Sequence, residues 1–304
     1  MFVSDELVFL HLQKAAGTRV VDVLARTLPG RVTPGHDPLR TGARGRAVAA
    51  AIRDPWDWYV SLWAYGAMGK GGVRGHVTQS HSAFYRQTLR AVATGRLRPE
   101  DAWRCLRRDR DRDPRAWAAR YAAGGVPAEE AARFRHWLRA VLTSPGAGHL
   151  PGLYPALPLC GQVGFMSYRV LSLFVEWSEW CRARRRIRTP SDALDILASA
   201  SILTHVLRCE RLEADLDALL RTLGHVRRMG GRGDRSTEGT RPNRSLRRDF
   251  TEYYDAETVA LVAQRDRLVV EAFGYRPPEL TRATALTPAG RSVPTMSGAW
   301  RVPA

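Results

Sequence analysis

A short stretch near the start of the chain changes character twice and constrains the fold more than any other. Leu7–Leu12 is apolar and partly β-branched or aromatic over the length of one strand, and apolar residues at helical spacing begin just after Thr18. The residues between them form a loop of mostly small side chains. A strand, a tight loop and a helix in this order are typical of α/β proteins, and we therefore expect an α/β fold.

The loop of this unit, Gln13–Thr18, suits an anion. Its small side chains let backbone N–H groups approach a ligand closely, and the start of the following helix adds partial positive charge. Lys14 supplies a full charge, and lysine is rare in a chain whose other basic residues, Lys70 apart, are all arginine or histidine. The alternative interpretation is an ordinary strand-to-helix turn in which Thr18 is the helix N-cap.

Length and charge bound the classes of protein to consider. A chain of 304 residues fits one α/β domain with insertions, and a net charge of +17 suits a polyanion or nucleotide partner. Enrichment in Ala, Arg, Gly and Pro along the whole chain is equally typical of a compositional bias of the source genome. The four cysteines form no C-x-x-C pair and indicate neither a zinc site nor a dense disulfide framework. The first apolar run is too short for a signal peptide or a membrane span, and we expect a cytoplasmic protein.

A second strand, loop and helix follow the first. Ala47–Ile52 is an apolar run of strand length, after which Asp54 suits a helix N-cap and Pro55 the first helical position. Arg53 follows the carboxyl end of that strand, where open α/β sheets bind ligands. Ser61 lies two helical turns further on. An arginine and a hydroxyl that converge on one point suit a phosphate.

His36 lies in the connection between the two units. The segment around it begins extended at Arg31 and continues with turn-forming residues, so we expect His36 on a loop. A histidine on an exposed loop is most often simply solvated, and the interest of His36 depends on its neighbours.

Three of these segments together resemble the sulfotransferases that use 3′-phosphoadenosine 5′-phosphosulfate (PAPS). Gln13–Thr18 after a strand resembles their phosphosulfate loop, which in the carbohydrate-modifying branch reads H-x-P-K-T-A-G-T. Arg53-Asp54-Pro55 followed by Ser61 resembles their 3′-phosphate motif. Gly35-His36 matches the Gly-His pair that carries the catalytic base in the heparan and dermatan 2-O-sulfotransferase-like branch. This chain has Gln13 and Ala15 where the family has proline and threonine.

The resemblance implies an enzyme that moves a sulfuryl group from PAPS to an acceptor hydroxyl of a carbohydrate or another small molecule. Lys14 would assist the leaving group and His36 would take the acceptor's proton, with no metal and no membrane partner. The implied donor-binding residues are Gln13, Lys14, Ala15, Ala16, Gly17, Thr18, Arg19, Arg53 and Ser61. The implied fold is a single P-loop-like domain over residues 1–280 with a central parallel sheet flanked by helices. The resemblance does not cover the middle of the chain, where helical patterns predict a largely helical insertion at 68–190 that binds the acceptor, and the composition of 281–304 predicts a C-terminal tail.

Within the middle of the chain, the Gly-rich segment 68–77 suggests a mobile loop or lid beside the site. His76 and His81 are the alternatives to His36 as the base. The alternating charges of 104–113 predict a solvated face, and Phe165–Cys181 predicts one apolar helix. Tryptophans at 103, 117 and 137 are typical of core packing, with stacking on an aromatic acceptor as the alternative.

The C-terminal part supports the same resemblance. Ile202–Leu207 reads as a buried strand, and Arg208–Asp215 resembles the family pattern R-x-E-x-L-x-x-D. A Gly/Arg-rich loop at 230–243 precedes Asn243-Arg244-Ser245. A short helix with Tyr253-Tyr254-Asp255 and a long helix that ends at Phe273 then resemble the family's closing segment.

Two other classes remain as alternatives. A P-loop nucleotide kinase also has a loop after its first strand, but the spacing G-x-x-x-x-G-K-[ST] is absent because the lysine precedes the only glycine of this loop, Gly17. A basic nucleic-acid-binding protein would account for the charge, but the chain has no zinc, RNP or heptad motif.

Overall fold

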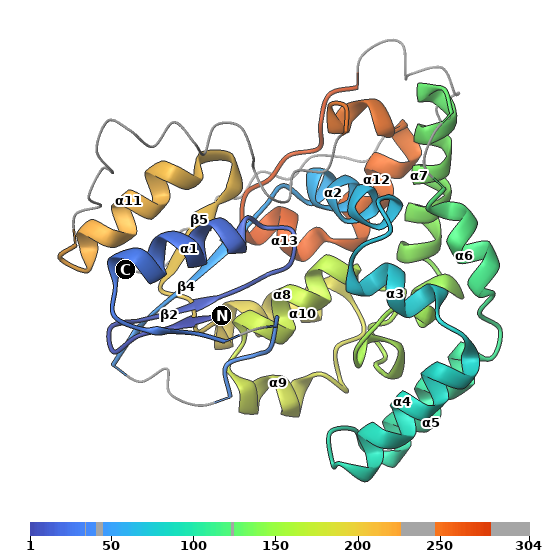
Figure 1. Cartoon of the computed structure of the whole chain (residues 1–304), viewed down its shortest axis with the longest axis horizontal. Coiled ribbons are helices and arrows are strands. Elements are labelled where there is room, and N and C mark those ends of the chain that lie inside the picture. The colour runs from blue at the N-terminus through green and yellow to red at the C-terminus, as the bar shows by residue number, and fades with distance from the viewer. Residues whose placement is uncertain (34, 41–44, 123–124, 226–246, 281–304) are drawn as a thin grey trace.

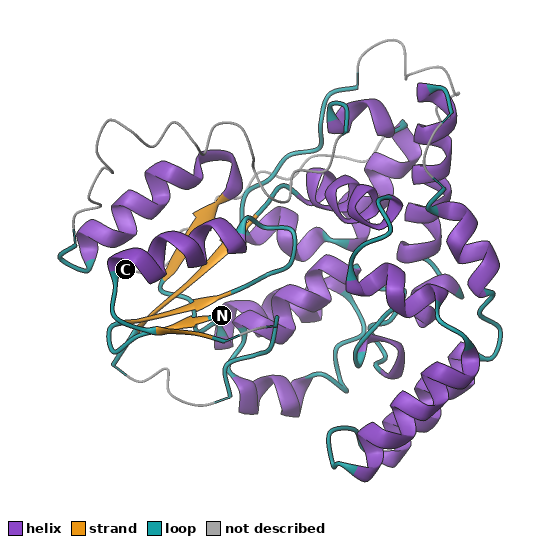
Figure 2. Ribbon diagram, viewed as in Figure 1, coloured by secondary structure: helices purple, strands orange, loops and turns teal. Residues whose placement is uncertain are grey.

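The computed structural model describes residues 1–33, 35–40, 45–122, 125–225 and 247–280. Within these ranges the chain is an α/β protein in which a mixed sheet lies beside a body of helices (Figures 1 and 2). The helices between the fourth and the fifth strand make up most of that body, so the middle of the chain is helical as expected. The predicted loop at 230–243, the segment Asn243-Arg244-Ser245 and the predicted tail at 281–304 lie wholly or largely outside the described residues.

The sheet has the strand order β3-β1-β2-β4-β5. Its strands are β1 (Phe2–Val3), β2 (Leu7–Leu10), β3 (Arg31–Val32), β4 (Ala47–Ile52) and β5 (His205–Arg208). The inner strands β2, β4 and β5 run parallel, whereas β1 is antiparallel to both β2 and β3. The prediction of a parallel sheet was therefore wrong for the β1–β3 edge. Only Ser4–Glu6 separate β1 from β2, and so short a connection permits only an antiparallel pair.

Local sequence signals set where many helices begin. The α-helices are α1 (Gly17–Thr27), α2 (Pro55–Ala67), α3 (Gly72–Thr78), α4 (His81–Ala93), α5 (Pro99–Asp109), α6 (Pro114–Arg120), α7 (Pro127–Leu142), α8 (Phe165–Phe174), α9 (Trp177–Ala183), α10 (Pro190–Ala200), α11 (Leu212–Thr222), α12 (Ala256–Arg265) and α13 (Arg267–Ala272). Single turns of 3-10 helix are η1 (Gly146–His149), η2 (Tyr154–Ala156), η3 (Cys209–Arg211) and η5 (Phe250–Tyr253). Proline at the first helical position begins α2, α5, α6, α7 and α10, where its missing N–H costs nothing.

Two predictions for the middle of the chain need correction. The Gly-rich segment 68–77, expected to be a mobile loop or lid beside the site, is not a loop throughout, because α3 begins at Gly72 and its Val73 and Val77 lie one turn apart and are both buried. The single helix expected over Phe165–Cys181 is divided into α8 and α9. The division falls at Val175 and Glu176, where the Glu176 N–H donates to the carbonyl of Ala200 at 2.8 Å.

The charged segment 104–113 is not simply a solvated face. Asp109 and Arg112 are buried, and the Arg112 Nε donates to Asp109 Oδ1 at 2.5 Å. The same guanidinium donates to the backbone carbonyls of Val77 and Gln79, which joins the end of α5 to α3. Of the three tryptophans expected in the core, those at 117 and 137 are buried, whereas Trp103 is 60% exposed.

The C-terminal helices pack against α2 and α8. The long helix expected there is divided into α12 and α13 at Asp266, which is wholly buried. Its carboxylate accepts from the Tyr59 hydroxyl at 2.7 Å and from the Ser167 N–H at 2.8 Å. Tyr253 and Tyr254 are buried in the same core, and the Tyr254 hydroxyl donates to the carbonyl of Trp56.

Candidate functional site

The carboxyl ends of the parallel strands β2, β4 and β5 meet at one edge of the sheet, and a cleft of about 1650 Å³ opens there. Such an edge is where open α/β sheets commonly bind ligands. Nearly all of the residues selected from the sequence line this cleft, namely Gln13, Lys14, Ala16, Gly17, Thr18, Arg19, His36, Arg53 and Ser61. Ala15 does not line the cleft, since it is fully buried behind the loop.

The loop between β2 and α1 has an unusual backbone. Lys14 and Ala16 have φ angles of 61° and 53°, in the left-handed region that non-glycine residues rarely adopt, while Ala15 between them does not. Alternation of hand in successive residues turns backbone N–H groups toward a common point, as in anion-binding nests. Among the described residues, no acceptor lies within hydrogen-bond distance of the Lys14 or Ala16 N–H. The loop therefore offers free donors at the start of α1.

Ala16 is the residue that precedes α1, and no side chain caps the helix. The alternative interpretation, a plain turn capped by Thr18, was therefore wrong. Gly17 is required by close packing, because a Cβ at this position would lie 1.9 Å from Cδ2 of the His11 ring. Gly17 and Thr18 at the start of α1 line the cleft, and no hydrogen bond of their N–H groups to the described residues is found, whereas the Arg19 N–H already donates to the Ala16 carbonyl at 3.0 Å.

Lys14 lies in a strongly positive environment. Its Nζ lies 3.9 Å from the centroid of the Tyr65 ring. The pKa of Lys14 is lowered to about 8, chiefly by burial and in addition by the charges of Arg53 and Arg247. An anion in the cleft would offset this repulsion.

Arg53 and Arg247 share a single carboxylate, that of Asp57. Arg53 Nε donates to Asp57 Oδ2 at 2.7 Å, and an Arg53 terminal nitrogen donates to the Lys14 carbonyl at 3.0 Å. Arg247 also donates to the Asp57 carboxylate. Both arginines also act on Lys14 and share only this one acid, so the cluster has an excess of positive charge.

Helix α2 contributes Asp57 to this cluster, and its Ser61 and Tyr65 line the cleft. Asp57, Ser61 and Tyr65 are spaced four residues apart and therefore share one face of α2. The predicted cap of this helix is confirmed, because Asp54 accepts from the N–H groups of Trp56 and Asp57. Ser61 lines the cleft and is otherwise buried.

His36 lies on a loop, as the sequence predicts, and packs against the loop after β2. Its Nδ1 lies 2.7 Å from the carbonyl oxygen of His11, and the His11 ring meets the His36 ring edge to face at 4.3 Å. A carbonyl only accepts, so this contact selects the tautomer with the proton on Nδ1 and leaves Nε2 free to accept one. Burial lowers the pKa of His36, and the charge of Arg169 lowers it further, which favours the neutral ring.

Arg169 of α8 is a site residue that sequence reasoning missed. Its Nε donates to the side-chain oxygen of Gln13 at 3.1 Å, and a terminal nitrogen donates to the His36 carbonyl at 2.8 Å. The Trp58 Nε1 fixes the same loop by donating to the Gln13 carbonyl at 2.6 Å. The only signal in the sequence was a charged residue within an otherwise apolar helix. Arg169 joins the anion loop to the loop of His36.

The two alternative bases are in different surroundings. His76 lines the cleft, and burial lowers its pKa to about 4. His81 is not among the lining residues, and its Nδ1 lies 2.8 Å from the carboxylate of Asp109. Of the two, only His76 therefore faces the site.

Within the described ranges, no group of three or more His, Cys, Asp or Glu side chains is arranged to hold a metal ion. No helix in the same ranges has the length and apolar character needed to cross a membrane.

No family model, curated protein sequence or solved structure matches this chain. Its described residues form an α/β protein with a basic cleft at the carboxyl ends of the parallel strands.

Proposed function

We propose that this protein is a sulfotransferase that moves a sulfuryl group from PAPS to an acceptor hydroxyl. The observation that carries the proposal is a cluster of three cations, Lys14, Arg53 and Arg247, beside a loop with free N–H groups. Its two arginines share the single carboxylate of Asp57. A nucleotide with phosphates at two positions would supply the missing negative charge. The order of the motifs along the chain, which resembles that of the sulfotransferases, supports the same reading.

Each residue then has a physical role in binding the donor. The N–H groups of the loop and of the first turn of α1, with the Thr18 hydroxyl, would bind the 5′-phosphate. Arg53 and Ser61 would bind the 3′-phosphate, with Asp57 holding the guanidinium in place. These contacts would fix the position of the sulfuryl group relative to Lys14.

The chemistry is an in-line transfer. The bond between sulfur and the bridging phosphate oxygen breaks while a bond forms between sulfur and the acceptor oxygen. Lys14 would stabilise the charge on the departing phosphate oxygen, a type of contribution worth about 3–4 kcal/mol where such donors are removed. His36 would take the acceptor's proton on Nε2, the nitrogen that the His11 contact leaves free.

The size of the cleft supports a reaction of two substrates. Its volume of about 1650 Å³ exceeds the range of roughly 300–1000 Å³ that is usual for a single small ligand. The wall away from the loop comes from the helical middle of the chain and includes Val73, His76, Pro151 and Phe165. We infer that the acceptor, a carbohydrate or another hydroxyl compound, lies against this wall.

The test is a comparison of nucleotides by calorimetry. The desulfated donor, 3′-phosphoadenosine 5′-phosphate (PAP), should bind at least about tenfold more tightly than 5′-AMP, because only PAP has a phosphate for Arg53. Arg53→Ala should remove this preference, whereas Arg221→Ala, an exposed arginine of α11, should leave it unchanged. Release of PAP from PAPS in the presence of a panel of hydroxyl acceptors then measures transfer.

The alternatives predict different results. Tighter binding of ATP with Mg²⁺ than of PAP would favour a nucleotide kinase. Equal affinity for PAP and 5′-AMP, together with tight binding of a DNA duplex, would favour a basic nucleic-acid-binding protein. Either outcome would overturn the proposed function.

A further inference from the structure

Helices α4 and α5 form a hairpin that projects from the rest of the helical body (Figure 1). Its inner side is already packed, because Phe84 and Cys105 form a small buried cluster with Ala156 of η2, and Leu106 packs against it. This cluster anchors one side of the hairpin to the helical body. Leu106 also reaches the other side of the hairpin, which is available to a partner.

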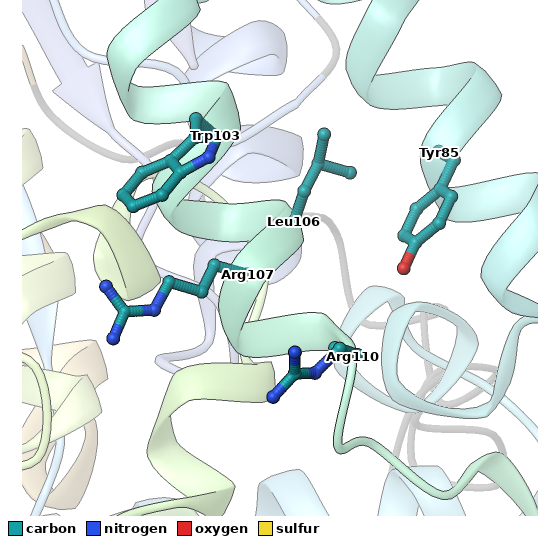
Figure 3. A pocket seen from close by; sticks show the side chains of 5 residues that line it. All are labelled: Tyr85, Trp103, Leu106, Arg107 and Arg110. Atoms are coloured by element: carbon teal, nitrogen blue, oxygen red, sulfur yellow. The ribbon is translucent and has the colours of Figure 1, made fainter.

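That other side has a groove of about 420 Å³ between the two helices. It is lined by Tyr85 of α4 and by Trp103, Leu106, Arg107 and Arg110 on the side of α5, and Figure 3 shows Leu106 between the rings of Trp103 and Tyr85. Trp103 is 60% exposed, and Leu89, one helical turn beyond Tyr85, is 62% exposed. Exposed apolar side chains gathered in this way mark interaction surfaces.

The hairpin is strongly basic, and two of its arginines, Arg107 and Arg110, line the groove. Residues 81–112 contain nine arginines and four carboxylates, and two of those carboxylates, Asp101 and Asp109, are buried in ion pairs. Within the described part of the chain, these exposed arginines of the hairpin have no ion-pair partner: Arg86, Arg90, Arg96, Arg98 and Arg107. The Arg107 guanidinium lies 5.5 Å from the Trp103 ring centroid, so cation and aromatic ring form one surface.

The positive charge of the hairpin makes a second copy of this chain an unfavourable partner. A second copy would place the same arginines against each other across a two-fold axis. The segments outside the described residues are no better matched, since 226–246 contains six arginines and two acids, and 281–304 contains three arginines and no acid. The partner must therefore be a different, acidic molecule.

The spacing of the apolar residues favours a helix as that partner. Trp103 and Leu106 are three residues apart on α5 and both line the groove, and on α4 the exposed Leu89 lies one helical turn from the lining residue Tyr85. A third helix packs into such a groove between two helices by inserting its own apolar row. Tryptophan, tyrosine and arginine are also the residues that most often dominate protein interfaces. We propose that the α4–α5 groove binds an acidic amphipathic helix of another protein.

A defined probe tests this proposal. A fluorescein-labelled synthetic peptide helix, with leucine at positions i, i+3, i+4 and i+7 and glutamate elsewhere, is titrated with the full chain and followed by anisotropy. The binding should be saturable and should weaken as salt is raised. Trp103→Ala should weaken it by about tenfold or more, as expected for a central interface tryptophan. Val126→Ala, an equally exposed apolar residue outside the hairpin, should change it less than about twofold.

Because Trp103 is exposed, Trp103→Ala removes no core packing, and Arg107→Ala gives a second surface variant. A scrambled peptide without the leucine row that binds equally well would overturn the proposal, since charge alone would then suffice. Failure of the helical peptide to bind, or the same affinity for Trp103→Ala, would also overturn it. Tighter, Trp103-dependent binding of a labelled DNA duplex would assign the groove to nucleic acid instead. No lining residue of the groove lines the cleft, so this outcome is independent of the proposed function.

Discussion

Replacement of Gly17 by alanine tests the packing on which the loop depends. An ideal Cβ at Gly17 would lie 1.9 Å, 2.2 Å and 2.6 Å from Cδ2, Nε2 and Cγ of the His11 ring. The ring cannot stay in place, and it also packs against His36 at 4.3 Å. Such overpacking costs about 1–3 kcal/mol, which outweighs the roughly 1 kcal/mol by which alanine favours a helix over glycine.

A double-mutant cycle separates these two contributions. Gly17→Ala should lower the free energy of unfolding in the native background. In the His11→Ala background, the same substitution should be neutral or stabilising, because the ring is gone and only the helix preference remains. Gly72→Ala is a matched control, since Gly72 is likewise the first residue of a helix, α3, and a Cβ there meets nothing within 4 Å.

Urea denaturation of the four proteins, followed by tryptophan fluorescence, gives the coupling energy directly. We expect a coupling of at least about 1 kcal/mol between positions 11 and 17. Additivity of the two substitutions within about 0.5 kcal/mol would refute the argument, because the clash with the His11 ring would then have no energetic weight. Calorimetry with PAP on Gly17→Ala adds a second measurement, since His11 lines the cleft.

Three further predictions concern charge. The affinity for PAP should fall as pH rises through about 8, where free Lys14 loses its proton, and Lys14→Gln should remove that dependence in a calorimetric pH series. Arg169→Met should lower kcat and move the acidic limb of the pH–rate profile to higher pH, because Arg169 lowers the pKa of His36; an unmoved limb would assign Arg169 a purely structural role. Burial raises the pKa of Asp266 to about 6. The folded state therefore holds the proton more tightly than the unfolded chain between pH 3.8 and about 6, and stability should fall by about 3 kcal/mol as pH rises through that window. Asp266→Asn should flatten this change in urea titrations at pH 4 and 7.

Features fixed by neighbouring residues were the ones predicted well. The strand Ala47–Ile52, the cap at Asp54 and the first helical position at Pro55 all agree with the structure. Each depends on hydrophobic period, capping or proline geometry within a few residues, so the sequence alone contains the information.

Features that depend on distant contacts were missed. Arg169 acts through Gln13 and His36, which are 156 and 133 residues away in the chain, and Arg247 meets Asp57 across 190 residues. No local pattern distinguishes Arg247 from the many other arginines in the sequence, and the only one for Arg169 is its position within an otherwise apolar helix. The helix α3 was taken for a lid because its glycines outweigh its two buried valines in a local reading, whereas packing against α6 decides the structure.

The strained backbone of the loop after β2 has a place in the proposed chemistry. A left-handed conformation costs about 1–2 kcal/mol for each non-glycine residue, and this loop has two such residues, Lys14 and Ala16, where glycine would relieve the strain. Glycine in place of Lys14 would remove the charged side chain, and at either position it would free the backbone to turn its N–H away. The surrounding contacts, from Trp58, Arg53 and Arg169 to residues 13 and 14, hold the strained form in place. The fold thus stabilises a conformation that aims free donors and a lysine at one point, which is the arrangement that an anionic donor needs before it binds.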